Sequence, residues 1–214
     1  MAMTIARGEE ICVEHAFTTV AAFRPGQGLP VSDGTRYTPV AISLHWLIAL
    51  LIFAGWGLGF YMADLPLSPT KLRYFSWHKW MGVTTFILVI LRVAWLATHS
   101  APPLPRVIPS WQARAARATH FALYLLMFVI PLSGWLMSSA KGVPTVYFGV
   151  LPLPDLIGKD KAVGHVLELV HSSLAFGLAA LVGLHVAAAL KHHFMDRDGL
   201  MGRMVPFVKP PRSS

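Results

Sequence analysis

The feature that most constrains this 214-residue chain is a set of long segments without Asp, Glu, Lys or Arg. A helix needs about 20 mainly apolar residues to cross the hydrocarbon core of a bilayer, and each of these segments is long enough. They cover residues 37–63, 119–140 and 169–190. A fourth apolar run, between Trp77 and Thr98, contains Arg92, which needs a partner inside a bundle if the run spans the membrane. Four prolines in residues 101–110 end this run, and we include it as a helix.

The composition is also that of a membrane protein. Hydrophobic residues make up 55% of the chain and charged residues 13%, with a mean hydropathy of +0.56, far from the balance of soluble domains. We therefore predict an all-α fold, an integral membrane four-helix bundle. The predicted helices cover about residues 37–63, 77–98, 118–140 and 163–194.

The segments outside these helices are predicted to be tails and loops. Residues 1–36 are mixed in charge and lack the basic leader and apolar core of a signal peptide, so we expect a mobile N-terminal tail. The transmembrane domain then covers residues 37–195, and residues 196–214 form a basic C-terminal tail. Residues 141–161 contain three prolines, and we expect them to form a loop across the mouth of the bundle.

The distribution of basic residues favours one orientation in the bilayer. With four helices, both termini lie on the same side, which carries eleven Lys and Arg residues against six on the other side. Because Lys and Arg concentrate in cytoplasmic loops, we expect both termini in the cytoplasm of a bacterial inner membrane. The same bias accounts for the net charge of +8, so we expect no nucleic-acid partner.

Histidine is the residue best placed to hold a cofactor. The single cysteine, Cys12, excludes an intramolecular disulfide framework, a CxxC zinc site, a four-cysteine iron–sulfur cluster and the CxxCH attachment of a c-type haem. Ten histidines are many for so hydrophobic a chain, and a histidine inside a membrane helix usually serves a function. Four fall at suitable depths in the predicted helices: His45, His78, His171 and His185.

The spacing of two of these histidines predicts two separate haem sites. Fourteen residues separate His171 from His185, which brings them to within about 40° of one direction and roughly 21 Å apart along the helix axis. Rings so distant cannot share one metal ion, but each can bind a different haem iron with a partner at its own depth. The alternating helix directions pair His171 with His78 near the outer surface and His185 with His45 near the inner surface.

Arg92 has two interpretations. It follows His78 by fourteen residues and therefore lies on the same helix face, at the depth of the inner site. At that depth its guanidinium can neutralise haem propionates. Alternatively, its side chain extends to the cytoplasmic interface.

Two further histidines lie near the inner site. His192 follows His185 by seven residues, on nearly the same face and about 10 Å closer to the cytoplasm. Its imidazole can exchange protons with a quinone, or it belongs to an interfacial basic cluster with Lys191, Arg197 and Arg203. His120 begins the third helix, and we interpret it as an interface residue rather than a ligand.

Several segments resemble the bacterial cytochrome b561 family, which includes the b-type cytochrome subunits of hydrogenases. The resemblance covers residues 35–207 and is most specific in the fourth helix and the segment after it. The matching segments are TRYTPVAISLHW, WHKWMG, LRVAW, VIPLSGW, VYFGVLPLP and GLHVAAALKHHFMDRDGLMGRMVP. The resemblance implies a four-helix membrane bundle with two non-covalent b haems, whose iron ligands fall on His45, His78, His171 and His185.

The resemblance also implies electron exchange, for which three functions stay open. The main expectation is an electron carrier between a periplasmic donor and the ubiquinone pool, because two histidine ligands leave neither iron an open position. One branch of the family oxidises superoxide at the outer face while reducing ubiquinone, which would make the chain a quinone-linked oxidoreductase. The third is a cytochrome b subunit that anchors a separate dehydrogenase. A histidine-rich transporter without haem is the alternative outside the family.

Overall fold

A computed structural model describes residues 36–99, 101–104 and 108–208 of the chain. Four long helices dominate this part: α2 (Pro39–Ala63), α3 (Pro69–Thr98), α4 (Ser110–Ala140) and α5 (Lys161–Lys191). In the described residues, these four helices are the ones long and apolar enough to cross a membrane. The predicted all-α membrane bundle of four helices is therefore confirmed.

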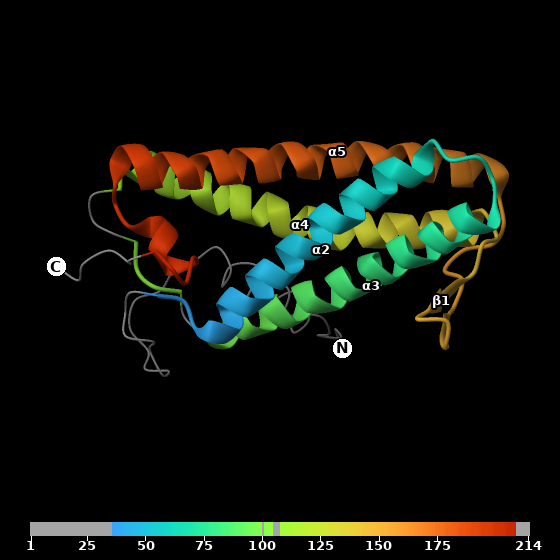
Figure 1. The fold of residues 1–214 in the computed structure, drawn as a ribbon, viewed down its shortest axis with the longest axis horizontal. Helices are drawn as coiled ribbons and strands as arrows, with labels where there is room; N and C mark the ends of the chain where they lie inside the picture. Colours follow the sequence, from blue (N-terminus) through green and yellow to red (C-terminus); the bar gives the residue numbers. More distant parts are fainter. Residues whose placement is uncertain (1–35, 100, 105–107, 209–214) are drawn as a thin grey trace, which may run out of the picture.

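The helices run in alternating directions along a long bundle (Figure 1). Helices α2 and α3 pack together, as do α4 and α5, and α3 also contacts α4. Figure 1 shows α2 crossing the bundle diagonally between α5 and α3. We call the end where α2 begins and α5 ends the terminal end, and the opposite end, which carries a β-hairpin, the hairpin end.

Two helices begin earlier than the apolar runs predict. Helix α3 begins at Pro69 instead of near Trp77, because Ser68 caps its first turn by accepting a hydrogen bond from the Lys71 backbone N–H at 3.2 Å. Helix α4 begins at Ser110 instead of near residue 118. Its first turns are polar and project beyond the apolar run, so hydropathy alone does not detect them.

A short β-hairpin lies within the segment that was predicted to be a loop. Strands β1 (Thr145–Tyr147) and β2 (Leu151–Leu153) pair antiparallel, joined by a turn in which Phe148 and Gly149 have φ values of +50° and +74°. The hairpin is fixed to α3, because the Trp80 indole donates to the Val146 carbonyl at 2.7 Å and the Thr84 and Tyr147 hydroxyls lie 2.8 Å apart.

The predicted C-terminal tail folds back over the terminal end. Helix α5 continues into a π-helical turn, η1 (His192–Asp196), and a 3-10 turn, η2 (Leu200–Arg203), follows. The Trp46 indole on α2 donates to the Met204 carbonyl at 2.8 Å, and Arg36 donates to the carbonyls of Pro206 and Val208. The rest of the predicted N-terminal tail, residues 1–35, lies outside the described part of the chain.

The outer surface of the bundle is apolar. Many large hydrophobic side chains on the four helices are exposed, among them Leu50, Phe53, Phe60 and Leu184. In contrast, a small group that includes Val89, Thr85 and Arg92 is buried inside. A lipid bilayer is the solvent that suits such a surface, and it leaves the polar side chains to gather between the helices.

Candidate haem sites

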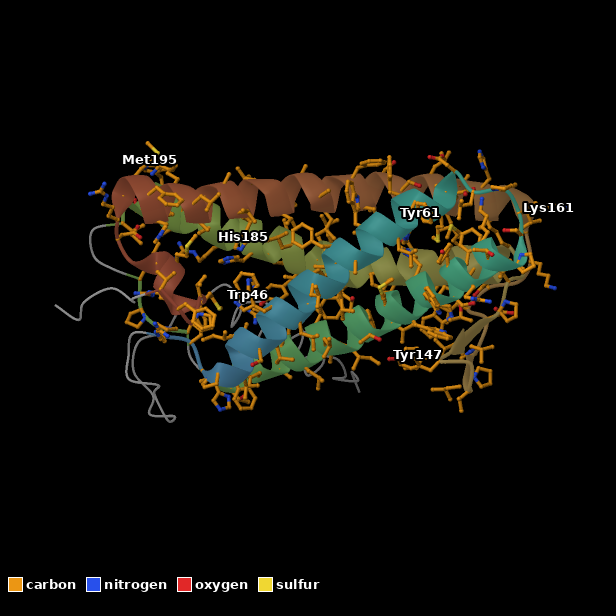
Figure 2. All side chains as sticks on the ribbon, in the orientation of Figure 1. Trp46, Tyr61, Tyr147, Lys161, His185 and Met195 are labelled. Atoms are coloured by element: carbon orange, nitrogen blue, oxygen red, sulfur yellow. The ribbon has the colours of Figure 1, made fainter. Side chains whose placement is uncertain are left out.

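The structure brings the four predicted ligand histidines together as two pairs. At the hairpin end, the ring centroids of His78 on α3 and His171 on α5 lie 6.1 Å apart. At the terminal end, those of His45 on α2 and His185 on α5 lie 6.3 Å apart. In Figure 2, His185 and Trp46 lie in the half of the bundle toward the terminal end, and Tyr61, Tyr147 and Lys161 lie toward the hairpin end.

Both separations suit a metal ion held between two imidazoles. Such an ion lies about 2 Å from each ligating nitrogen, and each ring centre lies roughly 1 Å further away, so the two centres are about 6 Å apart. The pairs therefore have the spacing that bis-histidine ligation of a haem iron requires. The role of these residues as ligands stays a prediction.

Glycines on the neighbouring helices make room for the hairpin-end rings. A Cβ atom added at Gly59 of α2 would lie 3.0 Å from Cε1 of His78. One added at Gly134 of α4 would lie 3.1 Å from Cε1 of His171. Each ring thus packs directly on the backbone of the next helix, and a larger residue at either position would displace it.

The Nδ1 atoms of these two rings differ in their hydrogen-bond partners. Nδ1 of His171 lies 3.0 Å from the Ser133 hydroxyl and 3.1 Å from the Ile130 carbonyl oxygen, both on α4. The backbone of Gly55 lies near the His78 ring, but Nδ1 of His78 is buried without a hydrogen-bond partner of ordinary geometry among the described residues.

A third histidine joins the terminal-end pair. The ring of His120 on α4 lies 5.4 Å from that of His185, centroid to centroid, in an edge-to-face contact. The sequence places His120 at this end but gives no sign of the contact, because that depends on how α4 and α5 pack side by side. His120 therefore lies directly beside the candidate terminal-end pair.

Arg92 lies inside the bundle near the same rings. Its side chain is only 6% exposed. Nε donates to the Tyr124 hydroxyl at 2.9 Å, and Nη1 donates to the Ala41 carbonyl. The guanidinium acts electrostatically on His45, His120 and His185. The partners that Arg92 requires are thus found among bundle residues, one of them in the first turn of α2 at the terminal end.

His192 contacts two carboxylates that the sequence analysis did not single out. Its Nδ1 lies 2.6 Å from the Asp198 carboxylate and 3.1 Å from that of Asp196. Asp198 is held in turn by the backbone N–H of Leu200, at 3.0 Å. The MDRD sequence after His192 was the available signal, but the contact with Asp198 forms where the chain turns back after η1.

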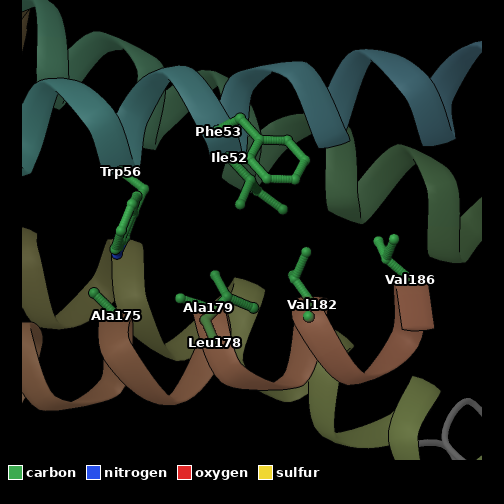
Figure 3. A pocket seen from close by; sticks show the side chains of 9 residues that line it. Ile52, Phe53, Trp56, Ala175, Leu178, Ala179, Val182 and Val186 are labelled. Atoms are coloured by element: carbon green, nitrogen blue, oxygen red, sulfur yellow. The ribbon is translucent and has the colours of Figure 1, made fainter. Parts of the chain in front are cut away.

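An apolar cavity of about 290 Å³ separates α2 from α5. Figure 3 shows side chains from both helices pointing into it. Its lining includes Ile52, Phe53 and Trp56 of α2 and Leu178, Val182 and Val186 of α5. Val186 directly follows His185, so the cavity extends along α5 to the level of the terminal-end pair.

Comparisons with known proteins agree on one family. Residues 36–207 match the family model described as prokaryotic cytochrome b561. The chain is 34% identical over 178 residues to "Cytochrome b561 homolog 2" of Escherichia coli (strain K12), covering 79% of this chain and 91% of that protein. It is 26% identical over 181 residues to "Probable superoxide oxidase CybB" of Yersinia pestis, covering 80% and 96% respectively.

Proposed function

The chain belongs to the prokaryotic cytochrome b561 family of membrane electron-transfer proteins, and we propose that it holds two b haems and exchanges electrons between a periplasmic donor and the ubiquinone pool. The family implies b-type haem in a multi-pass bacterial membrane protein. The observation that carries the proposal of two haems is the pair of histidine pairs, with ring centroids 6.1 Å and 6.3 Å apart at opposite ends of the bundle.

The four histidines are the residues that would hold the two haem irons. His78 and His171 hold one haem at the hairpin end, and His45 and His185 hold the other at the terminal end. When bound, the haem iron supplies reversible one-electron chemistry. Two histidine ligands at each site keep small molecules off the iron, so the protein's task is ligation, spacing and tuning of potential.

Other residues orient and balance the terminal-end site. We propose that the buried Arg92 neutralises a haem propionate, because its guanidinium is within electrostatic range of the three terminal-end histidines. His192 is proposed to exchange a proton with ubiquinone at the membrane edge, and its contact with Asp198 at 2.6 Å fixes the imidazole in place. His192→Ala should slow quinone reduction at unchanged haem content.

The proposed orientation has the terminal end in the cytoplasm. It rests on the excess of basic residues that the sequence assigns to the side of the two termini and on the tendency of Lys and Arg to stay on the cytoplasmic side. The hairpin end then faces the periplasm, where the electron donor would approach. Labelling of single cysteines placed at either end, in a Cys12→Ser background, tests this orientation.

Superoxide:ubiquinone oxidoreductase activity is the second candidate. The relative named "Probable superoxide oxidase CybB" favours it, as does a group of cationic residues at the hairpin end that would attract an anion. These residues are Lys71, Arg73, Lys79, Lys159 and Lys161. Superoxide alone should then drive ubiquinone reduction, at a rate that falls as salt screens these charges.

The third candidate is a cytochrome b subunit that anchors a separate dehydrogenase. Such a chain would be inert with small electron donors.

Quantitative haem analysis tests the main proposal. A reduced-minus-oxidised spectrum and pyridine haemochrome assay of the purified chain should give two b haems per polypeptide. One haem would refute the two-site scheme. A colourless protein would refute the haem function and favour a histidine-based transporter.

A further inference from the structure

Ser133 forms a compact polar cluster with His171 inside the bundle. The serine lies on α4, one residue before Gly134, and is only 5% exposed. Its hydroxyl donates to the Ile130 carbonyl at 2.7 Å and lies 3.0 Å from Nδ1 of His171. The same nitrogen lies 3.1 Å from the Ile130 carbonyl oxygen. Three polar atoms thus share the hydrogens of one hydroxyl and one imidazole.

The proton inventory of this cluster defines the tautomer of His171. A carbonyl oxygen can only accept, and the single hydroxyl hydrogen of Ser133 is directed at Ile130. The hydrogen between Nδ1 and the two oxygens must therefore come from the imidazole. His171 is then protonated on Nδ1, and its Nε2 carries the free lone pair that a metal ligand needs.

The partner ring is supported differently, since the backbone of Gly55 on α2 lies near it. Nδ1 of His78 is buried without a hydrogen-bond partner of ordinary geometry among the described residues. Its ring is located by packing on Gly59. Among the described residues of the hairpin-end pair, the side-chain hydroxyl contact is therefore made by His171 and not by His78.

We infer that Ser133 is a positioning residue of the hairpin-end haem site. Together with the Ile130 carbonyl, it holds His171 as the tautomer whose Nε2 faces the iron, and it strengthens electron donation by this ligand. This inference rests on the proposed haem ligation by His171. When an oxygen accepts a hydrogen bond from Nδ1–H, the imidazole becomes more basic. A more basic ligand stabilises ferric over ferrous iron. Ser133 thus lowers the reduction potential of this site.

The test is a potentiometric titration of the full chain and of Ser133→Ala, followed by optical and EPR spectroscopy. The component that His171→Ala removes identifies the hairpin-end haem. Ser133→Ala should weaken the preference for ferric iron roughly tenfold, the lower range for such supporting contacts. That change corresponds to an upward shift of about 59 mV in a one-electron potential. The terminal-end component should not move.

Two further variants separate positioning from general packing. Ser138→Ala removes another serine of α4 that is also 5% exposed. The reduction potentials of both haem sites in this variant should match those of the unmodified chain. Ser133→Thr keeps a hydroxyl that can donate to a preceding carbonyl, and should restore the potential and haem content if Ser133→Ala loses either.

The outcomes are distinct. A hairpin-end potential that is unchanged in Ser133→Ala, or that shifts equally in Ser138→Ala, would overturn the inference for a chain with two haems. Failure of Ser133→Thr to restore a loss seen in Ser133→Ala would also overturn it. An unmodified chain with fewer than two haems would instead refute the proposed function, and the inference with it.

Discussion

The two histidine pairs have nearly the same spacing but very different surroundings. At the hairpin end, the rings pack on glycine backbone and His171 is held by a neutral hydrogen-bond cluster. At the terminal end, a third imidazole contacts His185, and the buried guanidinium of Arg92 acts on all three rings. One candidate site is therefore shaped mainly by close packing and the other by charge, which would give the two proposed haems separately tuned potentials.

The largest expected effects come from removing one ligand of each pair on α5. His171→Ala should abolish haem binding at the hairpin end and spare the terminal end, whereas His185→Ala should do the reverse. Haemochrome analysis should give one haem per chain in both variants, with different optical and EPR spectra. Loss of both haems from each variant would contradict independent sites.

Alanine at the ring-packing glycines should have the next largest effect. The new methyl group in Gly134→Ala would lie 3.1 Å from the His171 ring, and that in Gly59→Ala 3.0 Å from His78. We expect haem affinity at the hairpin end to fall about tenfold or more because the rings are displaced. Haem retention under competition with apomyoglobin measures this.

Gly57→Ala is the matched control. Gly57 is two residues from Gly59 and therefore on the other side of α2, and a Cβ there would meet nothing within 4 Å. If Gly57→Ala lost haem as readily as Gly59→Ala, the loss would reflect a general effect on the helix and not on the His78 ring.

Arg92→Gln should affect the terminal-end site alone. As a generic scale, a unit positive charge about 10 Å from a redox centre, at an effective dielectric constant of about 20, contributes roughly 1.7 kcal/mol to holding the electron. Its removal should lower the terminal-end potential by about 70 mV. Redox titration measures both potentials, and Arg92→Lys, which keeps the charge, should shift them less. A larger shift at the hairpin end would contradict the assignment.

The smallest expected effects concern the segments that fold over the two ends of the bundle. Each is held by a hydrogen bond from a tryptophan indole to a backbone carbonyl. The Trp46 indole donates to Met204 at the terminal end, and the Trp80 indole donates to Val146 at the hairpin end. Trp46→Phe and Trp80→Phe should each lower the free energy of unfolding by about 1 kcal/mol, the net contribution of one hydrogen bond. Thermal unfolding in detergent measures the loss of stability in each variant. A clearly larger loss in one variant would show that the segment at that end contributes more to stability.

The sequence predicts the helices and the depth of each histidine, because uncharged runs and a fourteen-residue spacing depend on one helix at a time. Contacts between different helices could not be predicted from the sequence in the same way. His120 meets His185 only through the packing of α4 on α5, and Asp198 reaches His192 only after the chain turns back. The hairpin was also missed, because strands of three residues are too short for a periodic pattern and depend on contacts with Trp80 and Thr84.

Helix α5 supplies one histidine to each pair, so the segment between His171 and His185 fixes the distance and the relative direction of the two rings. One inserted residue between His171 and His185 would rotate one ring by about 100° relative to the other and lengthen the separation by about 1.5 Å. No single compensating change elsewhere could restore both contacts. We therefore expect substitutions in this segment to be tolerated far better than any change in its length.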